Sequence, residues 1–257
     1  MSAEARLSAL VVVHNEERQL AACLSALSFA DEIVVVLDRC TDRSREIAAG
    51  FTGQLHEGAW ELEAARRNFG IECCAGPWVL EVDADERVSA ELAAEIRAAV
   101  ATPDHDRYLI PVDNYIGATR VRYGWGGGFG KSAYHGLFRK GCKLWGKGRI
   151  HPAIQLSGRQ GPTLTVPLVH LVDRNISDML ARLDRYTTAR ACDLREFGDR
   201  DSTRTYIRRG FTRAYKCYVT RKGYREGTWG VLLAILAGLY PLLSHLKAKL
   251  EPDAPVN

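Results

Sequence analysis

Asp83-Ala84-Asp85 and the following Glu86 form the densest group of chemically useful side chains in this 257-residue sequence. They follow the apolar run Trp78–Val82, which predicts a buried strand. Carboxylates crowded at the mouth of a dry sheet repel one another unless a cation lies between them. Mg²⁺ or Mn²⁺ takes oxygen ligands and bridges to substrate phosphates, so Asp83 and Asp85 are predicted metal ligands at a site where a diphosphate leaves. A solvated acidic turn is the alternative.

Polar residues also follow two other apolar runs. Asp38 comes directly after Ile33–Leu37 and could accept hydrogen bonds from a nucleobase or ribose, or could cap the next helix. Asn15 and Glu16 come just after Leu7–Val13 and could face a nucleotide or open a helix. These three residues are therefore candidates for donor-nucleotide binding.

Short apolar runs alternate with helical patterns through the first hundred residues. The predicted strands are Leu7–Val13, Ile33–Leu37 and Trp78–Val82, and the predicted helices cover residues 17–27, 61–74 and 89–100, with another capped by Thr41 or Asp42. This order predicts a parallel, doubly wound α/β sheet. Ligands of such sheets bind beyond the carboxyl ends of the strands. Arg66 and Arg67 lie near that edge by topology and could contact a diphosphate, although a solvated helix face is the alternative.

The rest of the chain changes character after about residue 104. Three further strands are expected at Tyr108–Val112, Tyr134–Phe138 and Leu164–Val169, followed by helices from Ile176 onward. The glycine-rich segment 124–130 lacks the first glycine of a P-loop and predicts a mobile loop over donor or acceptor. We therefore expect an α/β domain at residues 1–172 and a helical, membrane-associating extension at 173–257.

The extension is basic and partly apolar. Residues 174–257 hold 16 Lys and Arg against 9 Asp and Glu, whereas residues 1–173 hold 19 against 22. Residues 229–246 contain no Asp, Glu, Lys or Arg. A helix lying in the membrane interface is the preferred prediction, with a membrane span and a buried core helix as alternatives. An anionic membrane surface is the expected partner; nucleic acid is not, because no recognised nucleic-acid module is present.

The cysteines and the first residues bear on the compartment. The seven cysteines are scattered and none has the CxxC spacing of a zinc or thioredoxin-like site. The opening residues MSAEARLS do not resemble a signal peptide, because no apolar run precedes a cleavage site. We expect reduced thiols in a cytoplasmic protein that is peripheral on the inner face of the cytoplasmic membrane.

The order of the motifs is more specific than any one of them. The chain reads V-x-x-H-N-E-E at 11–17, V-V-V-L-D-x-x-T-D-R-S at 34–44, R-R-N at 66–68 and W-V-L-E-V-D-A-D-E-R at 78–87. This series resembles glycosyltransferase family 2, and within it the branch that includes lipopolysaccharide core glycosyltransferases.

The resemblance implies a fold of the GT-A type, a nucleotide-sugar donor, Mg²⁺ or Mn²⁺, and inversion at the anomeric carbon. By position, Asp38 would contact the base, Arg66 or Arg67 the diphosphate, and Asp83 and Asp85 the ribose and the metal. The acceptor would be a cell-envelope glycan or a lipid-linked molecule of the lipopolysaccharide-core kind. The sequence does not indicate the sugar, the base or the oligomeric state.

An inverting transfer also needs a base for the proton of the acceptor hydroxyl. His151, Asp113 and Asp173 are candidates, and His151 or His170 could instead be a metal ligand or a core residue. The chain departs from the family pattern at Arg39-Cys40 and at His151-Pro152, which leaves the base open.

Two other classes of protein fit the sequence less well. A sugar nucleotidyltransferase would carry a glycine-rich phosphate loop at the first strand, where this chain reads His14-Asn15-Glu16-Glu17. A non-catalytic membrane-associated scaffold with a degenerate transferase fold would not need the intact Asp83-Ala84-Asp85.

Overall fold

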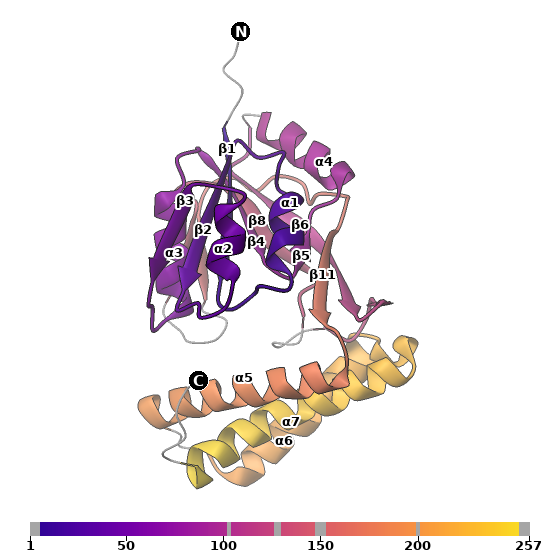
Figure 1. Ribbon diagram of the computed structural model, residues 1–257. Helices are drawn as coiled ribbons and strands as arrows, with labels where there is room; N and C mark the ends of the chain where they lie inside the picture. The colour runs from indigo at the N-terminus through magenta and orange to yellow at the C-terminus, as the bar shows by residue number, and fades with distance from the viewer. Residues whose placement is uncertain (1–5, 102–103, 126–129, 147–152, 199–200, 252–257) are drawn as a thin grey trace. The chain divides into compact units, whose positions relative to one another are not determined.

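The computed structural model describes residues 6–101, 104–125, 130–146, 153–198 and 201–251. The chain divides into two compact units (Figure 1). The first contains Met1–Asp113, Ala133–Gly148 and Pro152–His170, and the second contains Asn114–Ser132, Arg149–His151 and Leu171–Asn257. The predicted domain boundary between residues 172 and 173 stays a prediction.

A central sheet organises the first unit. Its parallel part has the order β3-β2-β1-β4, formed by β1 (Leu7–Val13), β2 (Glu32–Asp38), β3 (Gln54–Gly58) and β4 (Trp78–Asp83). The sheet continues through β8 (Ala133–Arg139), β6 (Arg107–Ile116), β11 (Leu168–Asp173) and β5 (Glu86–Arg87), while β7 (Thr119–Val121) pairs with β6 and β9 (Lys143–Trp145) pairs with β10 (Ile154–Leu156). The predicted α/β fold is confirmed.

The second half of the sheet, for which the sequence predicted strands but no direction, is antiparallel. β8 runs antiparallel to both β4 and β6, and β11 runs antiparallel to β5. Parallel neighbours need a long crossover, usually a helix. The described residues between β6 and β8 contain no helix, so these strands pair antiparallel.

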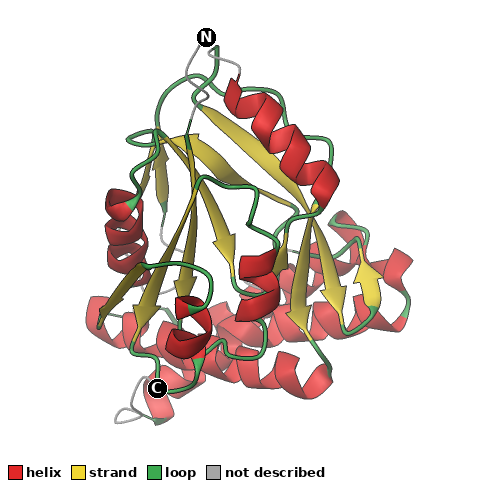
Figure 2. Cartoon of the chain, turned by 45° about the horizontal axis from the view of Figure 1, so that its top comes forward, coloured by secondary structure: helices red, strands yellow, loops and turns green. Residues whose placement is uncertain are grey.

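Helices cover both faces of the sheet in the first unit (Figures 1 and 2). They are α1 (Leu20–Ser25), α2 (Ser44–Ala49), α3 (Glu63–Cys73) and α4 (Ala90–Ala101). Successive strand residues point to opposite faces: Val11 packs in the cluster that holds Leu20 and Ile96, whereas Leu10 packs in the cluster that holds Ile71. The two apolar faces fix the register of β1, so the carboxyl ends of β1, β2 and β4 lie at one edge.

The second unit is mainly helical. It contains α5 (Ile176–Phe197), α6 (Thr203–Tyr215), a π-helical turn η1 (Lys216–Thr220), a 3₁₀ turn η2 (Gly223–Glu226) and α7 (Thr228–Leu250). Asn175 caps α5 by accepting from the backbone N–H of Asp178, and Ser202 caps α6 in the same way. A Cβ atom on Gly210 would lie 2.7 Å from the carbonyl oxygen of Gly238, so glycine allows α6 and α7 to approach closely.

Residues 229–246 fall within α7. Among the described helices, α7 is the one that is long and apolar enough to cross a membrane, by length and composition alone. Of its most apolar window, 44% is buried inside the structure, and a core helix has the same properties. Whether the segment lies in the interface, spans a bilayer or belongs to the core stays a prediction.

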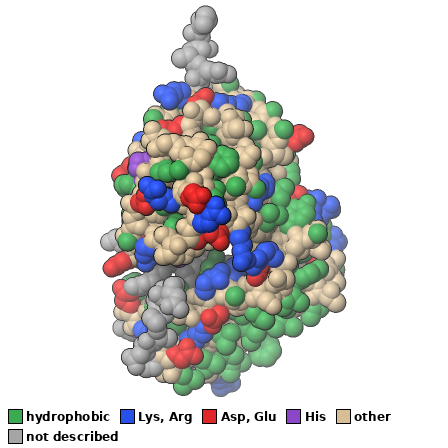
Figure 3. Space-filling model, viewed as in Figure 1, with side chains coloured by type: hydrophobic (Ala, Val, Ile, Leu, Met, Phe, Trp, Pro, Cys, Tyr) green, Lys and Arg blue, Asp and Glu red, His purple; other side chains and the backbone are tan. Residues whose placement is uncertain are grey.

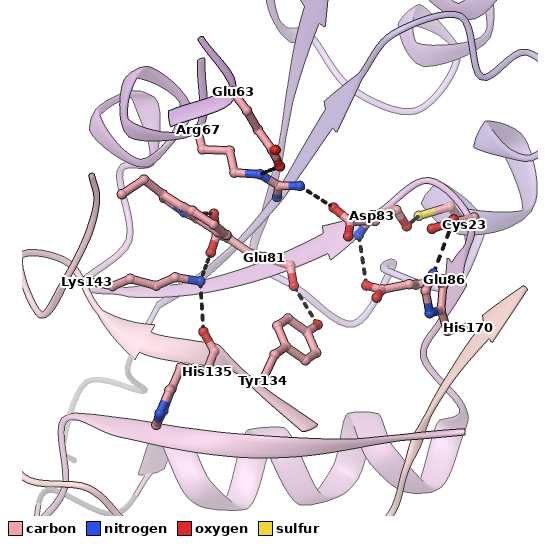
Figure 4. A network of polar contacts seen from close by, with 12 residues as sticks. Cys23, Glu63, Arg67, Glu81, Asp83, Glu86, Tyr134, His135, Lys143 and His170 are labelled. Carbon is pink, nitrogen blue, oxygen red and sulfur yellow. Dashed lines mark hydrogen bonds and ion pairs between the residues drawn. The ribbon is translucent and has the colours of Figure 1, made fainter. Parts of the chain in front are cut away.

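A buried ion pair joins β4 to β9 beneath the sheet edge (Figure 4). Glu81 and Lys143 are 3% and 4% exposed, and their carboxylate and ammonium are in direct contact. Lys143 also donates to the carbonyl oxygen of His135 at 3.0 Å, and the indole N–H of Trp145 donates to Glu81 at 2.9 Å. Each buried charge is thus compensated, which a buried charge requires.

Replacing Lys143 by Met should lower the free energy of unfolding by about 3–5 kcal/mol, because it leaves the Glu81 carboxylate buried without its cation. Urea denaturation measures the loss. The double variant Glu81→Gln/Lys143→Met should recover part of it, since the uncompensated charge is gone. A loss below about 1 kcal/mol in Lys143→Met would show that the pair is not a structural requirement.

Candidate active site

Asp38 is a buried carboxylate at the end of β2. Its side chain is 1% exposed and accepts four hydrogen bonds. They come from Arg66 Nη1 at 2.8 Å, from Arg39 Nε at 3.1 Å and Nη2 at 3.3 Å, and from the backbone N–H of Trp60 at 3.1 Å. Burial alone would raise the pKa of Asp38, but the Trp60 N–H and the two guanidiniums outweigh it and hold the pKa below its ordinary value. Asp38 is therefore an ionised, rigidly held acceptor.

Asn15 supports the turn that follows β2. Its backbone is in the left-handed region at φ 56°, and its Oδ1 accepts from the backbone N–H of Thr41 at 2.7 Å and of Asp42 at 3.3 Å. The backbone N–H of Glu16 donates to Ser44 Oγ at 2.9 Å. The β1 and β2 ends are thus tied together; contact of Asn15 or Glu16 with a nucleotide stays a prediction.

Asp83 pairs with the second arginine of the motif (Figure 4). Arg67 Nη2 lies 3.0 Å from Asp83 Oδ1, and Arg67 Nε lies 2.8 Å from Glu63 Oε1. The guanidinium also lies 4.8 Å from the centre of the Trp145 ring. Burial opposes the charge on Arg67, but Asp83, Glu63 and Glu81 outweigh burial and hold its pKa well above the ordinary value. In this form Arg66 and Arg67 each neutralise a carboxylate, and their contact with a diphosphate stays a prediction.

Asp85 faces a histidine. His170 Nε2 lies 3.3 Å from Asp85 Oδ2, and the two side chains are 12% and 31% exposed. The antiparallel pairing of β11 with β5 places His170 opposite Glu86. Glu86 is fully buried and accepts from the backbone N–H of Asp83 at 2.9 Å, which shapes the turn (Figure 4). The sequence singled out His170 only as an alternative ligand, because a pairing across more than eighty residues has no local signal.

The thiol nearest this turn is neutral. Cys23 Sγ lies 3.4 Å from the carbonyl oxygen of Asp83, and burial raises the pKa of the Cys23 thiol to about 12. Thiolates, not thiols, attack substrates and bind metals. Cys23 is thus a packing residue. In the described part of the chain, no three His, Cys, Asp or Glu side chains form a group that could hold a metal by themselves.

The candidate bases Asp113 and Asp173 differ in their burial and in the unit to which they belong. Asp113 lies half-buried on β6 of the first unit. Asp173 is 6% exposed and forms an ion pair with Arg182 at 2.6 Å in the second unit. His151 lies outside the described residues. The identity of the base stays a prediction.

The glycine-rich segment is described only at its ends. Trp125 is 7% exposed and packs in the apolar cluster of the second unit that includes Met179 and Leu233. Trp125 is therefore a core residue. Residues 126–129, the centre of the predicted loop, lie outside the described residues.

Several known proteins are similar to this chain in sequence. The model of glycosyl transferase family 2 matches residues 8–148. The lipopolysaccharide core biosynthesis glycosyltransferase LpsC of Rhizobium meliloti is 27% identical over 94% of this chain and 91% of its own length. An uncharacterized glycosyltransferase of Rickettsia typhi is 31% identical, over 40% of this chain and 36% of its own.

Solved structures share the fold. The structure of S. aureus TarS 1-349 has a TM-score of 0.50 at 13% identity and covers 94% of this chain and 90% of that chain. The same protein in complex with UDP-GlcNAc has a TM-score of 0.51 at 14% identity, covering 92% of this chain and 81% of that chain.

Replacing Arg66 by Gln should lower the free energy of unfolding by about 3 kcal/mol at pH 7, because it removes a cation from a buried carboxylate. The pKa of Asp38 is lowered by folding, so its contribution is present above its unfolded pKa of about 4 and is lost as the pH falls through the folded value. The difference in the free energy of unfolding between wild type and variant should therefore shrink below about pH 4. Denaturant titrations at a series of pH values from neutral to acidic measure this difference.

Arg39→Gln is the matched control, because Arg39 contacts the same carboxylate from a side chain that is 55% exposed. It should cost less than about 1 kcal/mol. Equal losses in the two variants, or a loss in Arg66→Gln that does not change with pH, would contradict the inference that Arg66, the less exposed of the two cations, stabilises folded Asp38 more than Arg39 does.

Proposed function

This chain belongs to glycosyl transferase family 2 and is a glycosyltransferase, and we propose that it transfers a sugar from a nucleotide-sugar donor, with inversion and with Mg²⁺ or Mn²⁺, to a cell-envelope glycan or lipid-linked acceptor. The observation that carries this proposal is that Asp38 and Asp83 are the last residues of β2 and β4 and that Asp85 follows β4 by two residues. Ligands of parallel α/β sheets bind at this edge.

The donor site divides into three parts. Asp38, held as an acceptor by Arg66, is suited to the N–H groups of a base. Asp83, fixed by Arg67, is suited to ribose hydroxyls. Arg66 and Arg67 can contact the diphosphate by releasing part of their carboxylate pairing, because a guanidinium has five donors.

Asp83 and Asp85 are the proposed carboxylate ligands of the divalent cation. His170 offers an imidazole nitrogen 3.3 Å from an Asp85 carboxylate oxygen, and both of these side chains are partly open to solvent. Mg²⁺ is commonly held by one or two protein carboxylates together with substrate phosphates and water, so two protein ligands suffice. When bound, the cation would neutralise charge on the leaving nucleoside diphosphate.

The transfer needs one proton acceptor. The oxygen of the acceptor hydroxyl attacks the anomeric carbon, the bond from that carbon to the diphosphate oxygen breaks, and the proton passes to a base on the opposite side of the sugar from the diphosphate. Asp113, half-buried on β6, and His151 are the proposed bases. The relative LpsC, a lipopolysaccharide core biosynthesis glycosyltransferase, supports an acceptor of the lipopolysaccharide-core kind.

Membrane association is proposed from the surface of the second unit. Ile207 and Phe211 on α6 are 43% and 74% exposed, and Val231 and Ile235 on α7 are 45% and 52% exposed. Residues four apart lie on one face of a helix, so each helix presents an apolar stripe. Figure 3 shows hydrophobic side chains gathered on this part of the surface. An amphipathic surface with basic neighbours binds the interface of an anionic membrane, on the cytoplasmic side in this proposal.

Nucleotide binding tests the donor site. UDP, GDP, ADP and CMP are titrated into the wild type with and without Mn²⁺, and the metal should strengthen binding of one of them. Asp85→Asn should weaken that binding at least about tenfold, a loss of about 1.4 kcal/mol, and should make it insensitive to EDTA. Asp104→Asn, an exposed carboxylate on a loop, is the control and should bind as the wild type does. Metal-independent binding that Asp85→Asn leaves unchanged would refute the metal site.

Vesicle sedimentation tests the membrane surface. Phe211→Ser/Ile235→Ser should bind phosphatidylglycerol vesicles at least about tenfold more weakly than the wild type, because two inserted apolar side chains are lost. Phe51→Ser/Ile154→Ser is the matched control, since these residues are 42% and 38% exposed in the first unit. Equal binding by both variants would contradict the proposed surface, while retained nucleotide binding shows that the chain is folded.

A further inference from the structure

A basic pocket opens among the helices of the second unit. It has a volume of about 540 Å³ and is walled by α5, α6, the start of η1 and α7. Its lining includes five cations: Arg190, Arg208, Arg209, Arg213 and Lys216. No Asp or Glu is among its lining residues, so the pocket is suited to an anion.

Three of these cations have no carboxylate partner in the described part of the chain. Arg209 pairs with Asp201 at 2.8 Å and Arg190 with Asp193 at 3.5 Å, whereas no ion pair joins Arg208, Arg213 or Lys216 to a described carboxylate. Burial lowers the pKa of Arg213, and the nearby charges of Arg221 and Arg190 lower it further although Tyr240 acts in the opposite sense. The like charges in the pocket repel one another, which destabilises the folded protein. A bound anion would remove this repulsion.

Aromatic rings orient two of the guanidiniums. Arg209 lies 4.9 Å from the ring centre of Tyr206, and Arg213 lies 4.9 Å from that of Tyr240. Tyr206 itself stacks on the fully buried His245 with ring centres 4.2 Å apart. A cation held over a ring is pre-positioned, so less side-chain entropy is lost when a ligand binds.

The pocket lies on the opposite side of α6 from its apolar stripe. Arg209 and Arg213 are each two residues beyond Ile207 and Phe211, which is a turn of about 200° at 3.6 residues per turn. If the stripe of α6 rests on a membrane, the pocket faces away from that membrane. A phosphate in the plane of the bilayer headgroups is therefore disfavoured as its occupant.

We propose that this pocket binds the phosphate group of a phosphorylated saccharide. Guanidinium groups match phosphate oxygens in bidentate geometry, and about 540 Å³ falls within the usual range for small-molecule sites and exceeds what phosphate alone requires. The choice of a saccharide rests on the proposed function, in which the acceptor is a glycan.

Calorimetric titration with glucose 6-phosphate tests the proposal on the full chain, with glucose as the uncharged probe. The wild type should bind the phosphate and not glucose, and added salt should weaken binding. Arg213→Gln/Lys216→Gln should weaken it at least tenfold, and Arg208→Gln/Lys216→Gln provides a second variant in which both side chains are exposed. Arg185→Gln/Arg204→Gln removes the same charge from exposed positions outside the pocket and should bind normally.

The same variants are titrated with the preferred nucleotide and Mn²⁺, so that the two sites can fail separately. The pocket variants should keep nucleotide binding, and Asp85→Asn should keep glucose 6-phosphate binding. Unchanged affinity in both pocket variants, or no binding by the wild type, would overturn the proposal. A second outcome would also overturn it: the wild type binds phosphatidic acid vesicles but not glucose 6-phosphate, and the pocket variants lose the vesicle binding. The occupant would then be a lipid headgroup.

Discussion

Buried negative charge at the carboxyl ends of β2 and β4 is the constraint on which the first unit depends. Asp38 at 1% exposure and Glu81 at 3% are stable as carboxylates only with cations in contact, and Arg66 and Lys143 provide them. These cations come from α3 and β9, so the elements around the edge are held by charge as well as by apolar packing. Asp38, the carboxylate proposed to contact the base, thus also holds α3 at this edge, and Glu81 holds β9.

The site contains arginines that are already paired with carboxylates and that stay positively charged. Arg67 is held between Asp83 and Glu63, with a raised pKa, and remains charged under all ordinary conditions. A diphosphate brought to this edge would compete with carboxylates that are already paired. A divalent cation at Asp85 and His170 would favour the diphosphate in that competition, because it adds positive charge where no arginine pairs with Asp85 in the described structure.

The helical unit separates two kinds of surface by helix geometry alone. On α6, apolar residues at 207 and 211 and cations at 209 and 213 occupy opposite faces. The close approach of α6 and α7 at Gly210 and Gly238 lets α7 contribute to both surfaces, with Ile235 exposed and Tyr240 in the pocket. Membrane binding and anion binding, as proposed, would therefore use different sides of one helix pair.

The sequence by itself determined the family, the parallel strands β1, β2 and β4, and the carboxylates at two of their ends. Buried strands and the motifs that follow them are local patterns, so they can be recognised without the fold. Membership of family 2 and the GT-A-like fold are confirmed. It missed β3 (Gln54–Gly58), a half-exposed edge strand without an apolar run. Only the tertiary structure decided the antiparallel half of the sheet, the partners of Asp38 and Asp83, the place of His170 opposite Asp85 and the basic pocket. Each of these depends on pairing between residues distant in the chain, which hydrophobic periodicity does not encode.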